Sequence, residues 1–204
     1  MLVYYTQIVP IPKPDVLSDF MPPIRRARMH PGRTHPGALF AYALAALALE
    51  RQLGRMAAEW IRYTDSGKPY LEDANMFLSL SHSKTHALFV LSENPIGCDI
   101  ETHRPISDRV PRRVLGTGEN PLDFFAYWTL KESYIKLRGK RTVPFSDLKF
   151  QITGDSATGC DTHGFLYRHI PNVTAAILAR EPFSCPELTM IETDEILSYA
   201  QSGD

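Results

Sequence analysis

The chain has 204 residues, of which 44% are hydrophobic and 22% are charged, and its formal net charge is −1. This length is enough for one large core or two small ones, and the balanced charge excludes a generally basic surface for nucleic acid. No segment is as long and apolar as a membrane span, the N-terminus lacks the basic region of a signal peptide, and the three cysteines fit neither a disulfide framework nor a zinc motif. We therefore expect a cytoplasmic protein.

The first eighty residues predict one helix and two short strands. Residues 1–33 are rich in proline and irregular, with a strand expected at Leu2–Val9. The apolar, Ala-rich segment Ala38–Leu53, which stops at Gly54, predicts a helix. A strand-like segment follows at Phe77–Leu80.

Two apolar runs, 86–92 and 96–101, flank the polar turn 93–95 and predict a β-hairpin. Side chains alternate between the faces of a strand, so Asp99 and Glu101 are expected to point the same way. Two carboxylates on one face repel each other unless a cation lies between them, and oxygen ligands of this kind suit Mg²⁺. An edge strand with two solvated acids would show the same pattern.

The segment Phe124–Arg138 predicts a helix that ends at Gly139, a residue suited to a left-handed C-cap. Before it, residues 103–121 show little periodicity and indicate a loop. At 100° per residue, one side of the helix carries an apolar, core-facing stripe made of Tyr127, Leu130, Tyr134 and Leu137. A nearly opposite stripe carries Trp128, Glu132 and Lys136. A solvated Glu–Lys pair that stabilises its own helix is the alternative interpretation, and on either reading Lys136→Ala is expected to reduce stability by under roughly 0.5 kcal/mol.

The remainder of the chain repeats the order of a helix followed by strands. A strand is expected at Leu148–Ile152, and a second hairpin joins 164–170 to 173–179. A helix followed by antiparallel strands, twice, predicts the α+β class. We expect two similar halves, residues 1–102 and 103–204, each consisting of a helix packed on a small antiparallel sheet.

Four segments in a fixed order resemble the 4′-phosphopantetheinyl transferase family. The most specific pair is Gly97–Glu101, with the sequence Gly-Cys-Asp-Ile-Glu, and Trp128–Lys136, with the sequence Trp-Thr-Leu-Lys-Glu-Ser-Tyr-Ile-Lys. Gly67–Leu71 is similar to the family's Gly-Lys-Pro segment and Leu78–Ser83 to its Leu-Ser-His-Ser segment. The resemblance covers about residues 67–150 and points to the longer, single-chain, pseudo-dimeric branch, which primes carrier proteins of polyketide and nonribosomal peptide synthases.

The resemblance implies a monomer whose active site lies in the cleft between the two halves. It also implies transfer of the 4′-phosphopantetheine arm of coenzyme A to a serine of an acyl or peptidyl carrier protein, with release of 3′,5′-adenosine bisphosphate. Phosphoryl transfer depends mainly on positioning and charge stabilisation. Two rival functions fit the same residues: a coenzyme A-binding module without turnover, and a Mg²⁺-dependent hydrolase of a nucleotide pyrophosphate.

Each matched position has an expected role. Asp99, Glu101 and Glu132 would hold Mg²⁺, and Lys136 would contact a phosphate as a point charge. Glu132, directly or through a metal-bound water, is the candidate to accept the serine proton. The resemblance also places Lys131 at the site, although a surface lysine would look the same.

Coenzyme A contacts are expected from a further set of matched positions. Ser81 and His82 would meet the phosphates and the bisphosphate sugar, while Lys68 and Pro69 would line the adenine pocket. A Gly-Lys-Pro turn is also frequent without such a role. A 3′-phosphate site is expected at Arg33 and Thr34, near a helix N-terminus, and an additional phosphate contact from the basic cluster Arg25, Arg26 and Arg28.

The chain departs from the family pattern in two places. The segment between Glu101 and Trp128 is shorter than usual in this branch, and that region ordinarily helps to bind the carrier protein. Ser133 replaces the more usual alanine, a change that a small side chain should allow. The basic residues of this shorter segment, Arg104, Arg109, Arg112 and Arg113, are expected to guide an acidic carrier.

Overall fold

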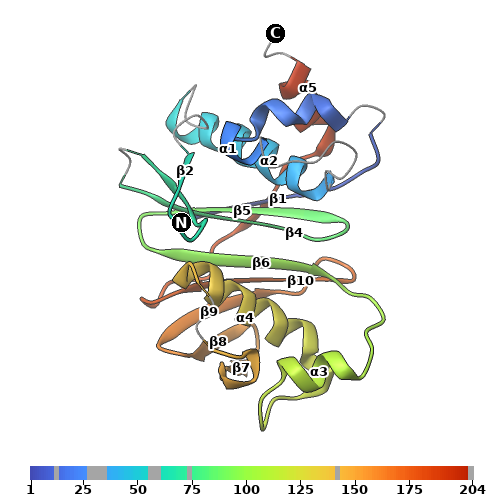
Figure 1. Cartoon of the computed structure of the whole chain (residues 1–204), viewed down its shortest axis with the longest axis vertical. Coiled ribbons are helices and arrows are strands. Elements are labelled where there is room, and N and C mark those ends of the chain that lie inside the picture. The colour runs from blue at the N-terminus through green and yellow to red at the C-terminus, as the bar shows by residue number, and fades with distance from the viewer. Residues whose placement is uncertain (12–13, 27–35, 55–60, 73–74, 141–142, 202–204) are drawn as a thin grey trace.

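Two sheets pack against each other between helices in the computed structural model (Figure 1). The structure describes residues 1–11, 14–26, 36–54, 61–72, 75–140 and 143–201. From top to bottom in Figure 1, the layers are helices, a first sheet, a second sheet, and a long helix with the remaining strands. This combination of helices with mainly antiparallel sheets is the expected α+β class.

The first sheet has four strands, and its helices cover only one face. Across the sheet the order is β11 (Leu188–Met190), β1 (Leu2–Gln7), β5 (His86–Ser92) and β4 (Phe77–His82). The long helix α2 (Pro36–Leu53) lies on this sheet, as predicted, and α5 (Thr193–Gln201) packs on α2. Shorter elements nearby are η1 (Pro14–Phe20), α1 (Pro23–Arg26) and the two-stranded hairpin β2 (Ile61–Tyr63) and β3 (Pro69–Leu71).

The second sheet has five strands and carries the helix α4 (Phe124–Arg138). Its order is β6 (Ile96–Thr102), β10 (Val173–Ala179), β9 (Thr162–Tyr167), β8 (Ser156–Gly159) and β7 (Gln151–Thr153). The predicted hairpin near the C-terminus is confirmed by the antiparallel pairing of β9 with β10. The strand expected at Leu148–Ile152 begins later, since β7 starts at Gln151.

Three buried clusters hold these layers together. One lies between α2 and the first sheet and includes Phe40 and Phe89, and a second lies between α4 and the second sheet and includes Leu130 and Leu166. The third lies between the two sheets, where Val90 of β5 packs with residues of β6 and β10. Each sheet is therefore covered on both faces.

The predicted hairpin of 86–92 with 96–101 is wrong. β5 and β6 follow each other in the chain, but they belong to different sheets. Both edges of β5 are already taken, by β1 on one side and β4 on the other, so β6 pairs with β10 instead. The segment Glu93–Pro95 is thus a crossing between sheets.

The predicted boundary after residue 102 does not separate the two sheets. β6, which ends at Thr102, belongs to the second sheet, and β11 near the C-terminus pairs parallel to β1 in the first. Within the predicted loop 103–121, residues Arg109–Val114 form the short helix α3. Of the described helices, none is long and apolar enough to cross a membrane.

A row of serines on β4 joins the first sheet to the edge of the second. Ser79 Oγ accepts a hydrogen bond from the Cys98 N–H at 3.0 Å, and Ser81 Oγ accepts one from the Ile100 N–H at 3.4 Å. Beyond the end of β4, Ser83 Oγ accepts one from the Thr102 hydroxyl at 2.8 Å. Alternate residues of a strand share a face, so these contacts line up along β6. Side-chain hydroxyls therefore satisfy backbone donors of β6 on the edge that faces β4. We call this row the serine seam.

Candidate active site

α4 lies against β6 because the facing residue, Gly97, has no side chain. A Cβ atom at Gly97 would come within 2.0 Å of the Ser133 carbonyl oxygen and 2.5 Å of the Leu137 nitrogen. The Ser133 hydroxyl donates to the Ala176 carbonyl at 3.1 Å, which fixes the same turn of α4 to β10. This close contact sets the rotation of the helix, so that Trp128, Glu132 and Lys136 are half-buried on its other side.

Asp99, Lys136 and Ser81 meet at the centre of the site from three different elements. The Lys136 Nζ lies 2.8 Å from Asp99 Oδ1 and 2.7 Å from Ser81 Oγ, and Ser81 donates to Asp99 Oδ1 at 2.7 Å. Burial opposes the charge on Lys136, but the Asp99 carboxylate outweighs it, with a smaller contribution from Glu132, so the net effect raises the lysine pKa. Lys136 is therefore a cation at neutral pH.

The second oxygen of Asp99 is buried without a hydrogen-bond partner. Asp99 Oδ2 is one of four such side-chain atoms among the described residues, and the indole nitrogen of Trp128 is another. An unpaired buried carboxylate oxygen is costly unless a cation or a donor meets it. The site thus has an open position for a positive charge beside Lys136.

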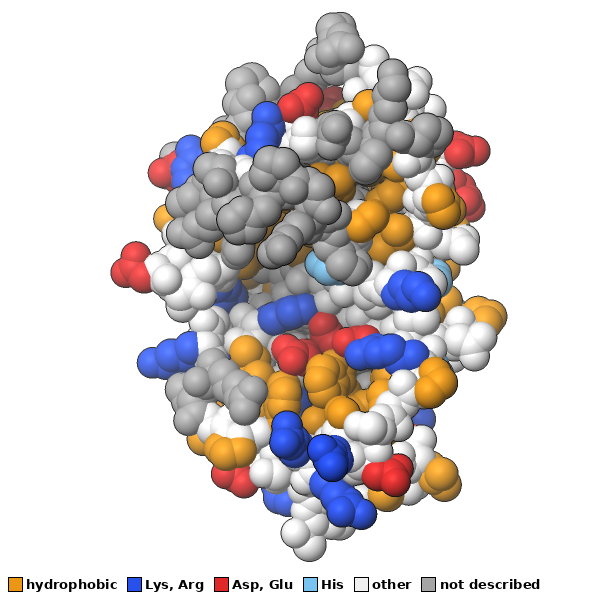
Figure 2. Space-filling view, turned by 45° about the vertical axis from the view of Figure 1, so that its right-hand side comes forward, with side chains coloured by type: hydrophobic (Ala, Val, Ile, Leu, Met, Phe, Trp, Pro, Cys, Tyr) orange, Lys and Arg blue, Asp and Glu red, His pale blue; other side chains and the backbone are white. Residues whose placement is uncertain are grey.

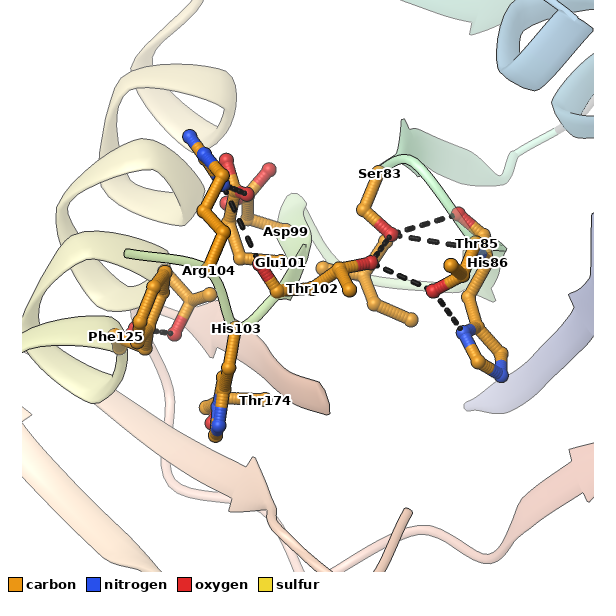
Figure 3. A network of polar contacts seen from close by, with 12 residues as sticks. Ser83, Thr85, His86, Asp99, Glu101, Thr102, His103, Arg104, Phe125 and Thr174 are labelled. Carbon is orange, nitrogen blue, oxygen red and sulfur yellow. Dashed lines mark hydrogen bonds and ion pairs between the residues drawn. The ribbon is translucent and has the colours of Figure 1, made fainter. Parts of the chain in front are cut away.

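Glu101 points to the same side of β6 as Asp99 and binds Arg104 (Figure 3). Its Oε2 lies 2.7 Å from the Arg104 guanidinium. Burial raises the pKa of the Glu101 carboxyl, and the Asp99 charge adds to this, while Arg104 and the nearby Trp128 indole oppose it. The two acids therefore share a face, as predicted, and each is paired with a basic side chain.

The three acids expected to bind metal are not gathered into one ligand set. Asp99 is held by Lys136, Glu101 by Arg104, and Glu132 is half-buried on α4, one turn before Lys136. Throughout the described part of the chain, no three His, Cys, Asp or Glu side chains lie close enough together to hold a metal ion. Figure 2 shows the acidic side chains at the centre of this face, with basic side chains around them.

Lys131 is not at the site, and its predicted role there is wrong. Its side chain is fully buried behind α4, where Nζ lies 2.5 Å from Glu119 Oε2 and donates to the Val114 carbonyl at 2.7 Å. Burial lowers the pKa of Lys131, and the hydrogen bond to Glu119 opposes that change. At 100° per residue, Lys131 faces a different direction from Glu132, and the buried acid at Glu119 stabilises it there.

A cavity of about 300 Å³ opens beside Lys136, between the first sheet and the end of α4. Lys68 and Pro69 line it, as the predicted adenine pocket requires, together with Tyr42 of α2 and Tyr63 of β2. The two tyrosine hydroxyls are 2.7 Å apart. The sequence pattern did not predict that either tyrosine lines this cavity. Tyr42, for example, lies within the apolar run of α2.

A second cavity, of about 460 Å³, lies at the other end of the serine seam. His82 lines it with Glu101, His103 and Arg104. Figure 3 shows the end of β6 here, where His103 stacks on Phe125 at 4.6 Å and bonds the Thr174 hydroxyl at 2.8 Å. Ser81 therefore lies at the ion pair, and the neighbouring His82 lines this second cavity.

The predicted phosphate contacts Arg28, Arg33 and Thr34 lie outside the described residues. So does the side chain of Arg25. Arg26 is exposed and pairs with Asp19 at 3.0 Å on the helix side of the first sheet. These positions remain predictions.

Residues 95–180 match the family model described as the 4′-phosphopantetheinyl transferase superfamily. The 4′-phosphopantetheinyl transferase Sfp of Bacillus subtilis is 27% identical over 151 residues, which cover 64% of this chain and 67% of Sfp. HetI of Nostoc sp. is 32% identical over 109 residues, which cover 45% of this chain and 46% of HetI. AcpT of Escherichia coli K12 is 28% identical over 139 residues, which cover 61% of this chain and 68% of AcpT. The matched region contains β6, α4 and β10, which build the centre of the site.

Over residues 95–180, which include the strands and the helix at the centre of the site, the chain is similar to 4′-phosphopantetheinyl transferases.

Proposed function

We propose that the protein transfers the 4′-phosphopantetheine arm of coenzyme A to a serine of an acyl or peptidyl carrier protein and releases 3′,5′-adenosine bisphosphate. One observation carries the proposal: the buried Asp99 Oδ2 has no partner, and it lies beside a charged lysine that lines a 300 Å³ cavity. A phosphate-bearing substrate with an associated cation would satisfy both charges. The cavity beside them has polar and aromatic walls suited to a nucleotide.

The chemistry of the site residues suits Mg²⁺, although the three acids are not gathered into one ligand set while Arg104 and Lys136 hold two of them. Asp99, Glu101 and Glu132 offer only carboxylate oxygens, which a hard cation prefers, and Asp99 Oδ2 is already desolvated and unpaired. When bound, Mg²⁺ would neutralise charge on the pyrophosphate. Lys136 and Arg104 now pair with two of these acids, so both basic side chains would be released toward the phosphates.

The chain's own residues supply the remaining chemistry. The carrier serine attacks the phosphorus that bears the pantetheine arm, its proton passes to the Glu132 carboxylate, and the bond to the adenosine 5′-phosphate breaks. Once released from Asp99, the Lys136 ammonium would stabilise the charge that grows on the leaving phosphate. Pro69 and the methylene chain of Lys68 would pack against the adenine base.

We also propose that the two helix-on-sheet units are the two similar halves of this family's single-chain branch. Asp99, Glu101, Glu132 and Lys136 come from β6 and α4 of the second unit, whereas Ser81, which bonds both Asp99 and Lys136, comes from β4 of the first. The site is complete only when the two units are folded together. A single chain could then act as a monomer.

A transfer assay tests the proposal. The protein is incubated with coenzyme A, Mg²⁺ and an unmodified carrier protein, and the carrier mass is measured. We expect a mass gain of one phosphopantetheine group, lost on chelation and lost in Asp99→Asn and Glu132→Gln. Ser156→Ala, an exposed position on β8 far along the second sheet, is the control variant and should retain activity.

The same assay separates the rival functions. Coenzyme A binding with no change in the carrier mass would indicate a binding module. Cleavage of coenzyme A without carrier modification would indicate a hydrolase. Full transfer after exhaustive chelation would contradict the metal requirement.

A further inference from the structure

The turn between β2 and β3 contacts the C-terminal end of α4. Lys68 Nζ donates a hydrogen bond to the Leu137 carbonyl oxygen at 2.6 Å. These residues lie 69 positions apart in the sequence, and Lys68 lines the same cavity as Lys136. The contact therefore ties the hairpin directly to the helix that carries the catalytic side chains.

The end of α4 is a place where a cation is favoured. The last carbonyls of a helix have no partner within it, and they carry partial negative charge. Gly139 ends the helix in the left-handed conformation, with φ 74°, and its N–H bonds the Ile135 carbonyl. The Leu137 carbonyl is one of the remaining acceptors, and Lys68 satisfies it.

The turn that presents Lys68 is held by its own hydrogen bonds. The Thr64 N–H bonds the Lys68 carbonyl, the Gly67 N–H bonds the Thr64 carbonyl, and the Thr64 hydroxyl accepts from the Lys68 N–H at 3.1 Å. The turn also fits closely against the helix end, because a Cβ at Gly139 would lie 3.1 Å from Ser66 Oγ and 3.5 Å from Lys68 Cδ. A rigid turn in van der Waals contact can hold a helix end in one place.

We propose that Lys68 is a positioning residue, which holds the last turn of α4 through the Leu137 carbonyl and so fixes the place of Lys136. Leu137 directly follows Lys136, so a displaced carbonyl moves the neighbouring lysine with it. The kinetic consequence rests on the proposed function, but the anchoring of the helix does not. If Lys68 served only to contact the adenine, its hydrogen bond to the Leu137 carbonyl would not be needed.

Substrates with and without adenine distinguish the two roles. Transfer is measured for wild type, Lys68→Met, Lys68→Arg and the control Lys140→Met, with coenzyme A and with an abasic analogue that lacks the adenine. Lys140 is exposed, lies directly after Gly139, and has no assigned part in the site. Lys68→Met should lower kcat by about 10-fold or more with both substrates, since a 1 Å misplacement can reduce rates by about 100-fold. Lys68→Arg, which keeps a donor, should recover part of the loss.

Hydrogen exchange gives a readout that does not depend on activity. In Lys68→Met, amides of a peptide covering residues 133–140 should exchange faster than in wild type and in Lys140→Met. Unchanged exchange in this peptide would overturn the proposal, as would a loss confined to the KM for coenzyme A that vanishes with the abasic analogue. If wild type transfers nothing, the proposed function fails and the exchange result alone decides whether Lys68 anchors α4.

Discussion

The ammonium group of Lys136 is shared between the Ser81 hydroxyl and the Asp99 carboxylate, whose side chain is only 8% exposed. Removal of this lysine would leave a nearly buried carboxylate with one oxygen held by Ser81 alone. The other oxygen already lacks a partner. The lysine therefore contributes to folding as well as to the site.

We predict that Lys136→Ala lowers the free energy of unfolding by about 1–3 kcal/mol, more than the limit of roughly 0.5 kcal/mol expected for an exposed helical pair. The loss of transfer should be larger still, about 2–4 kcal/mol in the barrier, because the charge faces the developing phosphate charge. A denaturant titration and the transfer assay measure the two effects. Turnover near that of wild type would refute the role given to this lysine.

His86 makes the stability of the folded protein depend on pH in the mildly acidic range. Its ring bonds the Thr85 hydroxyl at 2.8 Å (Figure 3). The ring also stacks with Tyr5, and burial lowers the pKa of its imidazole. The folded state therefore resists protonation that the unfolded chain accepts near pH 6.5. The stability present above that pH is lost as the pH falls toward the lowered pKa.

We predict that His86→Gln loses less stability than wild type between pH 7 and pH 5, while the two behave alike above pH 7. His169→Gln, at an exposed position, is the matched control and should follow wild type. Urea titrations at several pH values measure the difference. Parallel curves for all three proteins would show that His86 does not titrate in this way.

At the scale of elements, α4 is held on the side opposite the site by a buried ion pair. Glu119 receives the Lys131 ammonium and also accepts hydrogen bonds from the backbone N–H groups of Gly116 and Phe150, at 2.8 and 3.4 Å. The pair therefore joins the helix to the segment after α3 and to the start of the outer strands. Removal of one partner from such a pair leaves the other charge buried.

We predict that Lys131→Met lowers the free energy of unfolding by about 3–5 kcal/mol. The double variant Lys131→Met with Glu119→Gln removes both charges and should recover part of that loss, because the amide oxygen can still accept one of the two backbone bonds. Leu130→Ala, at a fully buried neighbouring position, should lower the free energy of unfolding by about 2–5 kcal/mol because it leaves a cavity, and it provides a reference for the size of the Lys131 effect. If the double variant is no more stable than Lys131→Met, charge burial is not the cause.

The helices were predicted from sequence more fully than the sheets. The apolar, Ala-rich composition predicted α2, the apolar period predicted α4, and the C-cap glycine predicted the end of α4 at Gly139. Strand pairing failed for β5 with β6, because period-2 patterns show that a strand is buried but not which strand lies beside it. The direction of Lys131 was also missed, since its partner Glu119 lies 12 residues away and appears in no local pattern.

At the scale of the whole molecule, one face joins the site to a basic helix. Arg109, Arg112 and Arg113 of α3 are exposed and share one side of it, at spacings of three and four residues. Figure 2 shows hydrophobic side chains between the central acids and a basic group at the lower end of the molecule, the end where Figure 1 places α3. Such a face would suit an acidic partner that must reach the central acids.

We predict that the KM for an acidic carrier rises with salt and that the double reversal Arg109→Glu with Arg113→Glu raises it by at least about 10-fold, with little change in the KM for coenzyme A. Arg104 is left intact, because it pairs with Glu101 at the site. Arg168→Glu, at an exposed position 3.4 Å from Asp123, is the control for either single reversal. Equal effects on both KM values would discard this surface as the carrier site.

The serine seam has a consequence for how the molecule opens. Separation of the two sheets would break the hydroxyl contacts of the seam and expose the buried cluster between the sheets, but it would break no backbone ladder, so we expect it to be a smaller event than global unfolding. Cys98 lies fully buried in the cluster between the sheets, and burial raises the pKa of its thiol to about 11. With Cys160 and Cys185 replaced by serine, the rate at which a thiol reagent modifies Cys98 measures the rate of that opening. A ligand that contacts both sheets should slow the modification.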